Sequence, residues 1–322
     1  MDSLELPLIS VLMPCHNAAP YVGEAVASVL AQTYPHVQLV IVDDGSTDGS
    51  SEILQQLATA HPECITLVYQ NRAGPWAARN HALARAHGQF IAFLDADDTW
   101  VPEALARLHA ALDSARADIA WGGWQTTGAV ATVPQPHLPP AADAAGALEH
   151  AFEHGTWPLN ALLIHRPRLD ALHGFSERLP TAMNFDLWLR LLAGAPVLAS
   201  VPETLAQRRL YPRGDARIPQ WQQVSDAVAV RRDFARRHPD AVAHYTPARL
   251  DELIYTPLLR EAYRCHWRHD TESARRLFRR AFRQADWKAG DLKHLLASLL
   301  PATAYRMLAD AVTGRRSTQT GR

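Results

Sequence analysis

Residues Phe90–Asp98 read FIAFLDADD, an apolar run that passes directly into three carboxylates within four positions. A continuous apolar run of this kind is typical of a strand that is buried on both faces, as in a parallel sheet. Carboxylates this close favour protonation unless a cation lies between them. Hard divalent ions such as Mg²⁺ or Mn²⁺ bind carboxylate and phosphate oxygens together. The stretch therefore predicts a buried strand that ends in a site for a metal-bound phosphorylated ligand.

The sequence around this stretch alternates between strand-like and helix-like patterns. Apolar runs predict strands at 8–13, 37–42, 65–69 and 90–94, and helical spacing predicts helices at 18–32, 51–60, 76–87 and 102–115. This alternation predicts an α/β fold with an open, mostly parallel sheet and helices on both faces. A further strand is expected at 161–164 and a helix at 185–193, and from about 219 onward the pattern is helical and rich in arginine.

The bulk composition narrows the class of protein. The chain has 322 residues, 48% of them hydrophobic, and a formal net charge of −1, so no global field favours nucleic acid as a partner. The three cysteines (Cys15, Cys64 and Cys265) are far apart and odd in number, which argues against disulfides and zinc and suits a reducing cytosol. Residues 1–7 carry no basic charge, unlike a signal peptide, and no apolar run reaches the roughly 18–20 residues of a membrane span. We expect a cytoplasmic protein.

Five carboxylates are expected at one edge of the sheet. Asp43 and Asp44 end the second predicted strand, and Asp95, Asp97 and Asp98 end the fourth. Parallel strands end on the same edge, where ligands of open α/β sheets bind. Acidic residues after a strand are often only turn formers or helix caps, but two such groups on one edge favour a ligand site.

Two other phosphate-binding classes fit the sequence poorly. Residues 14–17 read PCHN where a dinucleotide fold would have its glycine-rich turn, and no phosphate loop with Gly-Lys-Ser/Thr occurs. Residues 95–99 partly match the Asp-x-Asp-x-Thr signature of haloacid-dehalogenase phosphatases. That chemistry needs a downstream lysine, and the only lysines, Lys288 and Lys293, lie in the helical tail.

Several stretches together resemble family 2 glycosyltransferases. ISVLMPCHN at 9–17, ASVLAQTY at 27–34 and VIVDDGSTD at 40–48 look like the opening of that family. NRAG at 71–74, ARN at 78–80 and FLDADD at 93–98 continue the pattern in order, and GFSE at 174–177 and DLWLRL at 186–191 match its second half. The resemblance is strong over about 8–130 and fair over 155–212.

The resemblance implies a GT-A fold and an inverting transfer of a sugar from a nucleotide-diphosphate donor to an acceptor hydroxyl. The expected donor is a UDP-sugar, and the expected cofactor is Mg²⁺ or Mn²⁺. By motif, Asp44 would bind the base and Asp43 would lie near the ribose. Asp97 would bind the metal, and Asp95 would meet the ribose or a metal-bound water and Asp98 the sugar. Further nucleotide-pocket and diphosphate-binding positions implied in the same way are Pro14, Asn17, Arg72 and Arg79, where a guanidinium fork suits phosphate.

The chain departs from the family at the position of the catalytic base. The family usually has a Glu-Asp pair before the helix expected at 185–193, with the Asp as base, and here that position falls on Asn184, whose amide cannot accept a proton usefully. Asn184 could cap the helix, with Asp186 in its first turn. Asp186 could be the base, although two helical residues turn a side chain by roughly 200°. His165 or His173 could also supply the base. Otherwise the protein is a sugar-nucleotide-binding pseudoenzyme or assembly partner.

The remaining expectations concern the acceptor and the tail. We expect residues 1–215 to form the GT-A domain, with a nucleotide-binding half at about 1–125 and an acceptor half at about 126–215, and 216–322 to form a helical extension. The resemblance implies a glycan or lipid-linked acceptor, for which Trp121, Trp124 and Trp157 could stack on sugar rings or simply pack in the core. The arginine-rich helix at 274–283 either packs on the catalytic domain or contacts a membrane surface peripherally.

Overall fold

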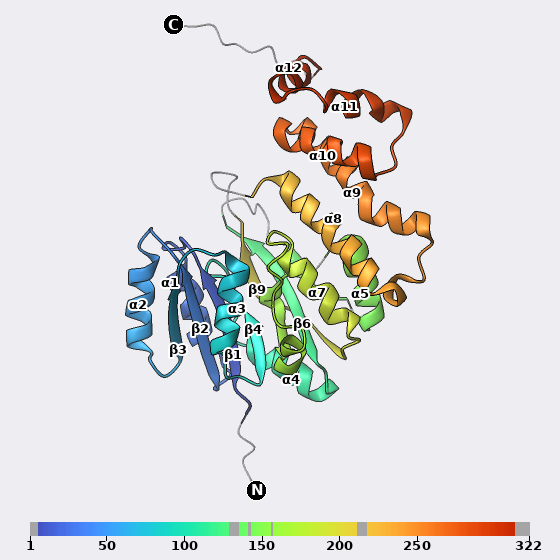
Figure 1. The fold of residues 1–322 in the computed structure, drawn as a ribbon. Coiled ribbons are helices and arrows are strands. Elements are labelled where there is room, and N and C mark those ends of the chain that lie inside the picture. Colours follow the sequence, from blue (N-terminus) through green and yellow to red (C-terminus); the bar gives the residue numbers. More distant parts are fainter. Residues whose placement is uncertain (1–5, 129–134, 141–142, 156, 211–217, 313–322) are drawn as a thin grey trace, which may run out of the picture. The chain divides into compact units, whose positions relative to one another are not determined.

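The computed structural model describes residues 6–128, 135–140, 143–155, 157–210 and 218–312 (Figure 1). The chain divides into two compact units, residues 1–214 and 215–322. The domain boundary predicted at 215/216 falls among residues 211–217, outside the described residues.

The first unit begins with the predicted alternation of strands and helices. Its first half runs β1 (Ile9–Cys15), α1 (Val22–Leu30), β2 (Val37–Asp44), α2 (Ser50–Ala60), β3 (Ile65–Gln70), α3 (Pro75–Arg85), β4 (Phe90–Phe93), β5 (Thr99–Trp100) and α4 (Ala104–Ala115). The second half contains β6 (Ile119–Thr127), β7 (Pro136–His137), α5 (Ala144–His154), β8 (Leu162–His165), α6 (Arg166–Asp170), α7 (Met183–Ala193) and β9 (Leu198–Arg209). The α/β class predicted from the sequence is confirmed.

One sheet joins the nine strands found in the described residues, in the order β3-β2-β1-β4-β8-β6-β9-β5, with β7 paired to β6. The part from β3 to β4 is parallel, as predicted, with β1 between β2 and β4. Beyond β4 the sheet is mixed, because β8 runs antiparallel to both β4 and β6, while β9 runs parallel to β6. The parallel part places the carboxyl ends of β1, β2 and β4 at one edge.

Helices cover both faces of this parallel part. Ile9, Val11 and Met13 of β1 lie in one core cluster with buried residues of α1 and α4. Leu12 points to the opposite face and is also fully buried. Figure 1 shows α3 lying across β1 and β2. Burial on both faces explains why the strands read as continuous apolar runs.

The loop after β1 makes α1 shorter than predicted. The helix begins at Val22 and not at 18, because the backbone N–H groups of residues 17–19 donate to the side chains of Ser46, Ser50 and Asp48. These N–H···O distances are 2.9–3.1 Å. The turn-rich stretch after β2 therefore holds the end of β1 in place.

Gly88 makes a close backbone approach that we expect to be intolerant of any side chain. A Cβ there would lie 2.5 Å from the backbone nitrogen of Ser10 and 2.8 Å from the carbonyl oxygens of Leu8 and Phe90. Gly88→Ala should lower the free energy of unfolding by about 3 kcal/mol, measured by urea denaturation. Gly23→Ala in α1 is the matched control, since a Cβ there meets nothing within 4 Å. It should stabilise the protein by about 0.5–1 kcal/mol, and equal effects of the two changes would contradict the prediction.

The second unit is helical, as predicted. It contains α8 (Gln220–Arg237), α9 (Pro247–Trp267), α10 (Thr271–Gln284), α11 (Leu292–Ala297) and α12 (Ala302–Val312). The buried face of α10 includes Leu277 and Phe278. On its other side Arg275 and Arg279 donate to backbone carbonyls within residues 298–300. Two of the arginines considered for a membrane surface thus bind the turn after α11.

No helix of the described residues is long and apolar enough to cross a membrane.

Candidate functional site

Two groups of acidic residues lie on the shared edge of the sheet, as the parallel topology requires. Asp43 and Asp44 end β2, and Asp95, Asp97 and Asp98 follow β4. Because β1 separates β2 from β4, the two groups start from strands roughly 10 Å apart. In the structure the first group holds neighbouring loops in place, whereas the second group forms a cluster of carboxylates.

Asp43 is buried and holds the loop that follows it. Its carboxylate accepts a hydrogen bond from the Ser46 backbone N–H at 2.9 Å and another from the Ser51 hydroxyl. Asn17, after β1, has a left-handed φ of 51° and accepts a bond from the Thr47 N–H at 2.8 Å. These contacts fasten the loop after β1 to the loop after β2 and so shape one wall of the edge. Pro14, in β1, pairs with Val42 of β2.

Asp44 is also buried and fixes the loop before α3. One carboxylate oxygen accepts bonds from the Gln70 amide at 2.8 Å and the Ala73 N–H at 2.7 Å, and the other accepts from the Gly74 N–H at 2.9 Å. Three donors to one carboxylate hold it in a fixed orientation. Asp44 therefore sets the backbone of residues 73–74 at the edge.

Arg72 lies exposed in that same loop. Its Nη1 lies 2.5 Å from Nε2 of His16, and the other ring nitrogen of His16 lies 3.0 Å from the Asp44 carbonyl oxygen. The guanidinium is thus held at the edge by the residue that follows β1. It remains accessible to an anion there.

Arg79 is on α3 and points inward toward the second acidic group. It is 2% exposed, forms an ion pair with Asp95, and its Nη1 lies 3.5 Å from the Met183 sulfur at the start of α7. The Asp95 side chain is 45% exposed. Arg79 therefore holds Asp95 from the buried side of the site, and part of the Asp95 carboxylate stays exposed to a ligand.

Asp95, Asp97 and Asp98 form a tight cluster, with one oxygen from each lying within 4.8 Å of the others. Asp98 is held on both oxygens, by the Asn160 amide at 2.7 Å and by the Arg209 N–H at 2.9 Å. An all-carboxylate oxygen set is the kind that Mg²⁺ and Mn²⁺ prefer. The cluster fits a divalent cation, because a cation would offset the repulsion between its members.

Asp98 should make the free energy of unfolding of the protein depend on pH. Burial, together with the charges of Asp95 and Asp97, raises the pKa of Asp98 to about 8. The folded-state pKa lies above the unfolded value of about 4, so the folded state holds the proton more tightly. We expect the free energy of unfolding of the protein in EDTA to fall as the pH rises from about 4 toward about 8.

Asp98→Asn should flatten this pH dependence, as measured by urea unfolding in EDTA at pH 5 and pH 8. The substitution is sterically mild, because Asn160 can turn its amide and present Oδ1 to the new side chain. A pH slope that is the same in the variant and the parent protein would contradict the assignment to Asp98.

A pocket of about 220 Å³ lies beside the cluster. Its lining residues are Asp95, Asp98, Trp124, Trp157, Pro158, Leu159, Asn160, Asn184 and Arg208. Three buried polar atoms of these residues, Trp124 Nε1, Asn160 Oδ1 and Asn184 Oδ1, have no hydrogen-bond partner among the described residues. Buried polar atoms in folded proteins are nearly always paired, so unpartnered atoms in three lining residues suit a pocket that takes a polar ligand.

The three tryptophans proposed for sugar stacking have different surroundings. Trp157 donates to the Gly122 carbonyl at 2.8 Å and lines the pocket, and Trp124 lines it while stacked on His137 with a centroid separation of 4.1 Å. Trp121 is buried between Trp157 and Trp188. Trp121 packs in the core, whereas the other two present surface to the pocket.

Helix α7 begins at Met183, so the prediction that Asn184 caps it is wrong. Its cap residue is Ala182, with no side-chain bond, and Asn184 lies inside the first turn. The predicted place of Asp186 in that turn is confirmed. Asn184 lines the pocket.

Asp186 makes an ion pair away from the residues that line the pocket. Its carboxylate accepts from Arg190 Nε at 2.7 Å, and Arg190 also donates to the carbonyls of Leu172 and Gly174, each at 3.0 Å. His165 and His173, the other residues considered for the base, are not among the lining residues.

Two pocket residues, Asn160 and Arg208, were missed by the sequence reasoning. Asn160 belongs to no motif and stands alone in an apolar stretch, so no local signal marks it. Arg208 is at the end of β9 in the run QRR at 207–209, and a basic pair that ends a strand is a faint signal. Arg208 is in β9 and Asn160 lies in a 3-10 turn just before β8, and the pairing of these two strands is not evident from the sequence.

Residues 10–161 match the family model described as glycosyl transferase family 2. Over this segment, just under half of its length, the chain is similar to that family. It is 44% identical over 101 residues to a putative teichuronic acid biosynthesis glycosyltransferase, TuaG, of Bacillus subtilis, a match that covers 31% of this chain and 40% of that protein. It is 29% identical over 205 residues to a chondroitin synthase of Escherichia coli, covering 59% of this chain and 27% of that protein. The matches span less than half the length of these relatives.

Comparison with solved structures shows that the chain has the GT-A fold. The chain aligns with S. aureus TarS 1–349 in complex with UDP-GlcNAc at a TM-score of 0.64 and 19% identity, covering 96% of this chain and 93% of that one. It aligns with the mannosyltransferase PcManGT from Pyrobaculum calidifontis, in complex with GDP-Man and Mn²⁺, at 0.59 and 19% identity, covering 96% and 87%. The predicted GT-A fold with a helical C-terminal region is confirmed.

Proposed function

We propose that this family 2 protein is an inverting, metal-dependent glycosyltransferase of polysaccharide biosynthesis. It moves a sugar from a nucleotide-diphosphate donor, a UDP-sugar, to a hydroxyl of a glycan or lipid-linked acceptor. The observation that carries the proposal is the three-aspartate cluster beside a pocket with unpartnered polar atoms. We assign catalysis to residues 1–215 and treat 216–322 as a helical extension.

Asp97 and Asp95 are the proposed metal ligands. When bound there, Mg²⁺ or Mn²⁺ stabilises the charge of a departing diphosphate as a Lewis acid. Arg79 keeps Asp95 in place, and the hydrogen bonds to Asp98 keep the third carboxylate of the cluster turned toward the other two. Arg72, exposed at the same edge, supplies positive charge for the diphosphate.

The nucleotide is proposed to lie along the edge formed by Pro14, Asn17, Asp43 and Asp44. In support, both aspartates fix backbone there, so the wall is formed before the ligand arrives. Relatives by fold were solved with UDP, UDP-GlcNAc or GDP-Man. The nucleotide base of the donor, uracil or guanine, therefore most needs a direct test.

The donor sugar is proposed to occupy the pocket. Asn160 and Asn184 can accept hydrogen bonds from sugar hydroxyls, and Trp124 can donate one. The Trp157 ring offers an apolar face for the sugar ring. Arg208 at the rim can bind a phosphate oxygen or a sugar hydroxyl.

Titration calorimetry tests this proposal, with UDP and GDP each added in Mn²⁺ and again in EDTA. We expect UDP to bind at least tenfold more tightly in Mn²⁺ than in EDTA, and GDP to bind more weakly than UDP. Equal binding of both nucleotides with and without metal would overturn the donor assignment. Turnover is then measured as UDP release from UDP-sugars with an acceptor panel.

A second candidate function is favoured by one observation, the amide of Asn184 at the family's base position together with the ion pair of Asp186. On this alternative the protein binds sugar nucleotides as a pseudoenzyme or assembly partner. Metal-dependent UDP binding without donor turnover over a broad acceptor panel would favour it.

We also propose peripheral contact with the cytoplasmic face of a membrane, where lipid-linked acceptors would be met. Exposed apolar side chains gather on α11, α12 and the turn between them, namely Leu292, Leu296, Leu299, Met307 and Leu308. Exposed apolar side chains next to basic residues such as Lys293 suit an anionic bilayer surface. Flotation of the protein with phosphatidylglycerol vesicles should be lost in Leu296→Ser/Leu299→Ser, and equal flotation of that variant would refute the contact.

A further inference from the structure

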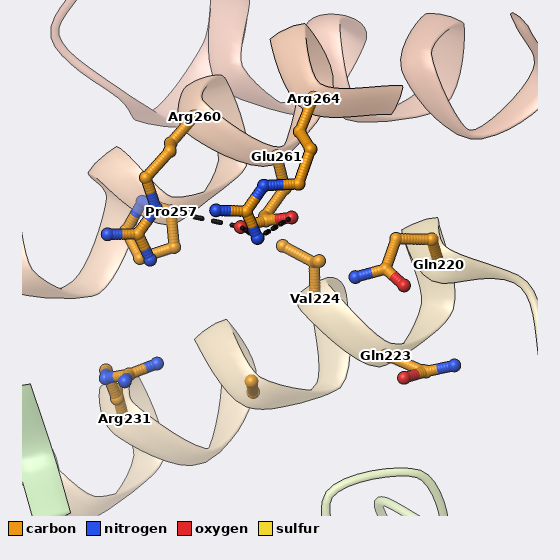
Figure 2. Close-up of a pocket in the computed structure, with 9 residues that line it drawn as sticks. Gln220, Gln223, Val224, Arg231, Pro257, Arg260, Glu261 and Arg264 are labelled. Atoms are coloured by element: carbon orange, nitrogen blue, oxygen red, sulfur yellow. Dashed lines mark hydrogen bonds and ion pairs between the residues drawn. The ribbon is translucent and has the colours of Figure 1, made fainter. Parts of the chain in front are cut away.

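A second pocket lies wholly within the helical unit, between α8 and α9 (Figure 2). Its volume is about 240 Å³. It lies outside residues 10–161, the part of the chain that matches the family model. Its lining residues are Gln220, Gln223, Val224, Ala227, Arg231, Pro257, Arg260, Glu261 and Arg264.

The charge that lines this pocket is mainly positive. Figure 2 shows Arg260, Glu261 and Arg264 on the α9 wall and Arg231 on the facing α8 wall. Glu261 is largely buried and lies 2.9 Å from Arg264 Nη1 and 3.7 Å from Arg260 Nε. Three guanidinium groups and one carboxylate therefore line the pocket, an excess of two positive charges.

Arg231 is the most buried of the three arginines that line the pocket. It is 8% exposed, and burial lowers its pKa to about 10, with the positive charge of Arg260 acting in the same direction. The Arg260 side chain is 65% exposed, so water screens part of the repulsion between the two positive charges but does not abolish it. An anion between them would relieve this repulsion.

The size and the neutral lining indicate what kind of anion would fit. Gln220 and Gln223 contribute carboxamides, and Gln223 donates to the Ile218 carbonyl at 2.8 Å, so its amide is held in place. Val224, Ala227 and Pro257 supply an apolar floor. The volume is about eight times the ~30 Å³ of one water in the liquid. That is more room than one small inorganic ion needs.

We propose that this pocket binds the phosphate group of a larger phosphate-bearing molecule, with Arg231, Arg260 and Arg264 as its ligands. Guanidinium groups bind phosphate oxygens through paired N–H donors, and arginines from two facing helices can reach oxygens on different sides of a tetrahedral group. The phosphate could belong to a soluble phosphate ester or to a lipid headgroup. The inference does not depend on the proposed transferase activity.

The experiment is titration of the full chain with glycerol 3-phosphate and, separately, with phosphatidylglycerol vesicles, in EDTA so that the aspartate cluster holds no metal. We expect Arg260→Gln/Arg264→Gln to weaken binding by about tenfold. Arg237→Gln is the matched control, an exposed arginine of α8 outside the pocket lining, and should leave binding unchanged. Glu261→Gln removes the carboxylate of the pocket and should tighten binding several-fold, a gain that misfolding cannot produce.

The two titrations distinguish the sources of the phosphate. Binding of glycerol 3-phosphate that depends on Arg260 and Arg264 supports a soluble ligand, and binding of vesicles alone with the same dependence supports a headgroup. Absence of binding to both, or affinities that match in the parent protein, Arg260→Gln/Arg264→Gln and Glu261→Gln, would overturn the proposal.

Discussion

Asp97→Asn is expected to lower kcat/KM for sugar transfer by about 10²–10³-fold, the size of effect seen when one charge-stabilising group is removed from an active site. The oxygens of Asp97, Asp95 and Asp98 lie within 4.8 Å of one another, so the substitution removes one of three clustered negative charges. An amide offers one neutral oxygen, which binds Mg²⁺ or Mn²⁺ more weakly than a carboxylate does. The rate should recover partly at high Mn²⁺, because weakened metal affinity is overcome by mass action.

The matched control for this prediction is Asp113→Asn, which makes the same change of charge at an exposed position of α4. It should leave kcat/KM within about twofold of the parent protein. Donor binding is measured beside turnover, by UDP titration with and without Mn²⁺. If Asp97→Asn kept both its activity and the metal dependence of UDP binding, the proposed metal site would be wrong.

The parallel half of the fold could be predicted because its signals are local. The strands β1, β2 and β4 are buried on both faces and read as apolar runs, and each helix follows within a few residues. The edge where β2 and β4 end follows from topology alone, so the positions of Asp44 and Asp97 at one edge were predictable.

The mixed half carries no comparable signal. β6 pairs with β9 about 80 residues away along the chain, and the register shifts at Gly122 and Gly123. Pro202 and Glu203 interrupt the apolar pattern of β9, since they lie where that register shifts. Asn160 and Arg208 were missed because they reach the pocket through these distant pairings.

Side-chain partners were the other part that the sequence could not reveal. From the sequence, all five aspartates of the edge are expected to bind parts of the ligand or its metal. In the structure Asp43 and Asp44 are buried and bind backbone N–H groups, whereas Asp95, Asp97 and Asp98 form the cluster. Which donor meets which carboxylate depends on loop geometry, and residue spacing does not encode it.

Asn184→Asp is expected to raise the rate of transfer by about 10²–10⁴-fold, the usual contribution of a general base. Asn184 lines the pocket and its buried Oδ1 has no partner among the described residues, so the variant would place a carboxylate of the same shape at the family's base position. Its place in the first turn of α7 favours a negative charge, while the nearby carboxylates of Asp95 and Asp98 would raise its pKa. A raised pKa brings a carboxylate closer to the value that suits a base near neutral pH.

Asp186→Asn tests the other assignment of the base. The Asp186 and Arg190 side chains are only 15% and 17% exposed, so removal of the carboxylate leaves a mostly buried guanidinium without its ion-pair partner. We expect a loss of about 2 kcal/mol in the free energy of unfolding, together with loosening of the carbonyl contacts at 172 and 174. If Asp186 only positions this loop, transfer should fall in proportion to the folded fraction. If it is the base, transfer should fall by about 10²-fold or more in fully folded protein.

The two variants and one control decide between the assignments when UDP binding and transfer are measured together. Gln56→Glu, on the exposed side of α2, introduces a carboxylate away from the site and should change neither quantity. A large gain in Asn184→Asp with unchanged UDP affinity would show that the natural pocket lacks its base and holds the donor all the same. No gain there, with loss of transfer and intact UDP binding in Asp186→Asn, would assign the base to Asp186. The ion pair with Arg190 would then have to open during turnover, because a carboxylate held by a guanidinium is a poor proton acceptor.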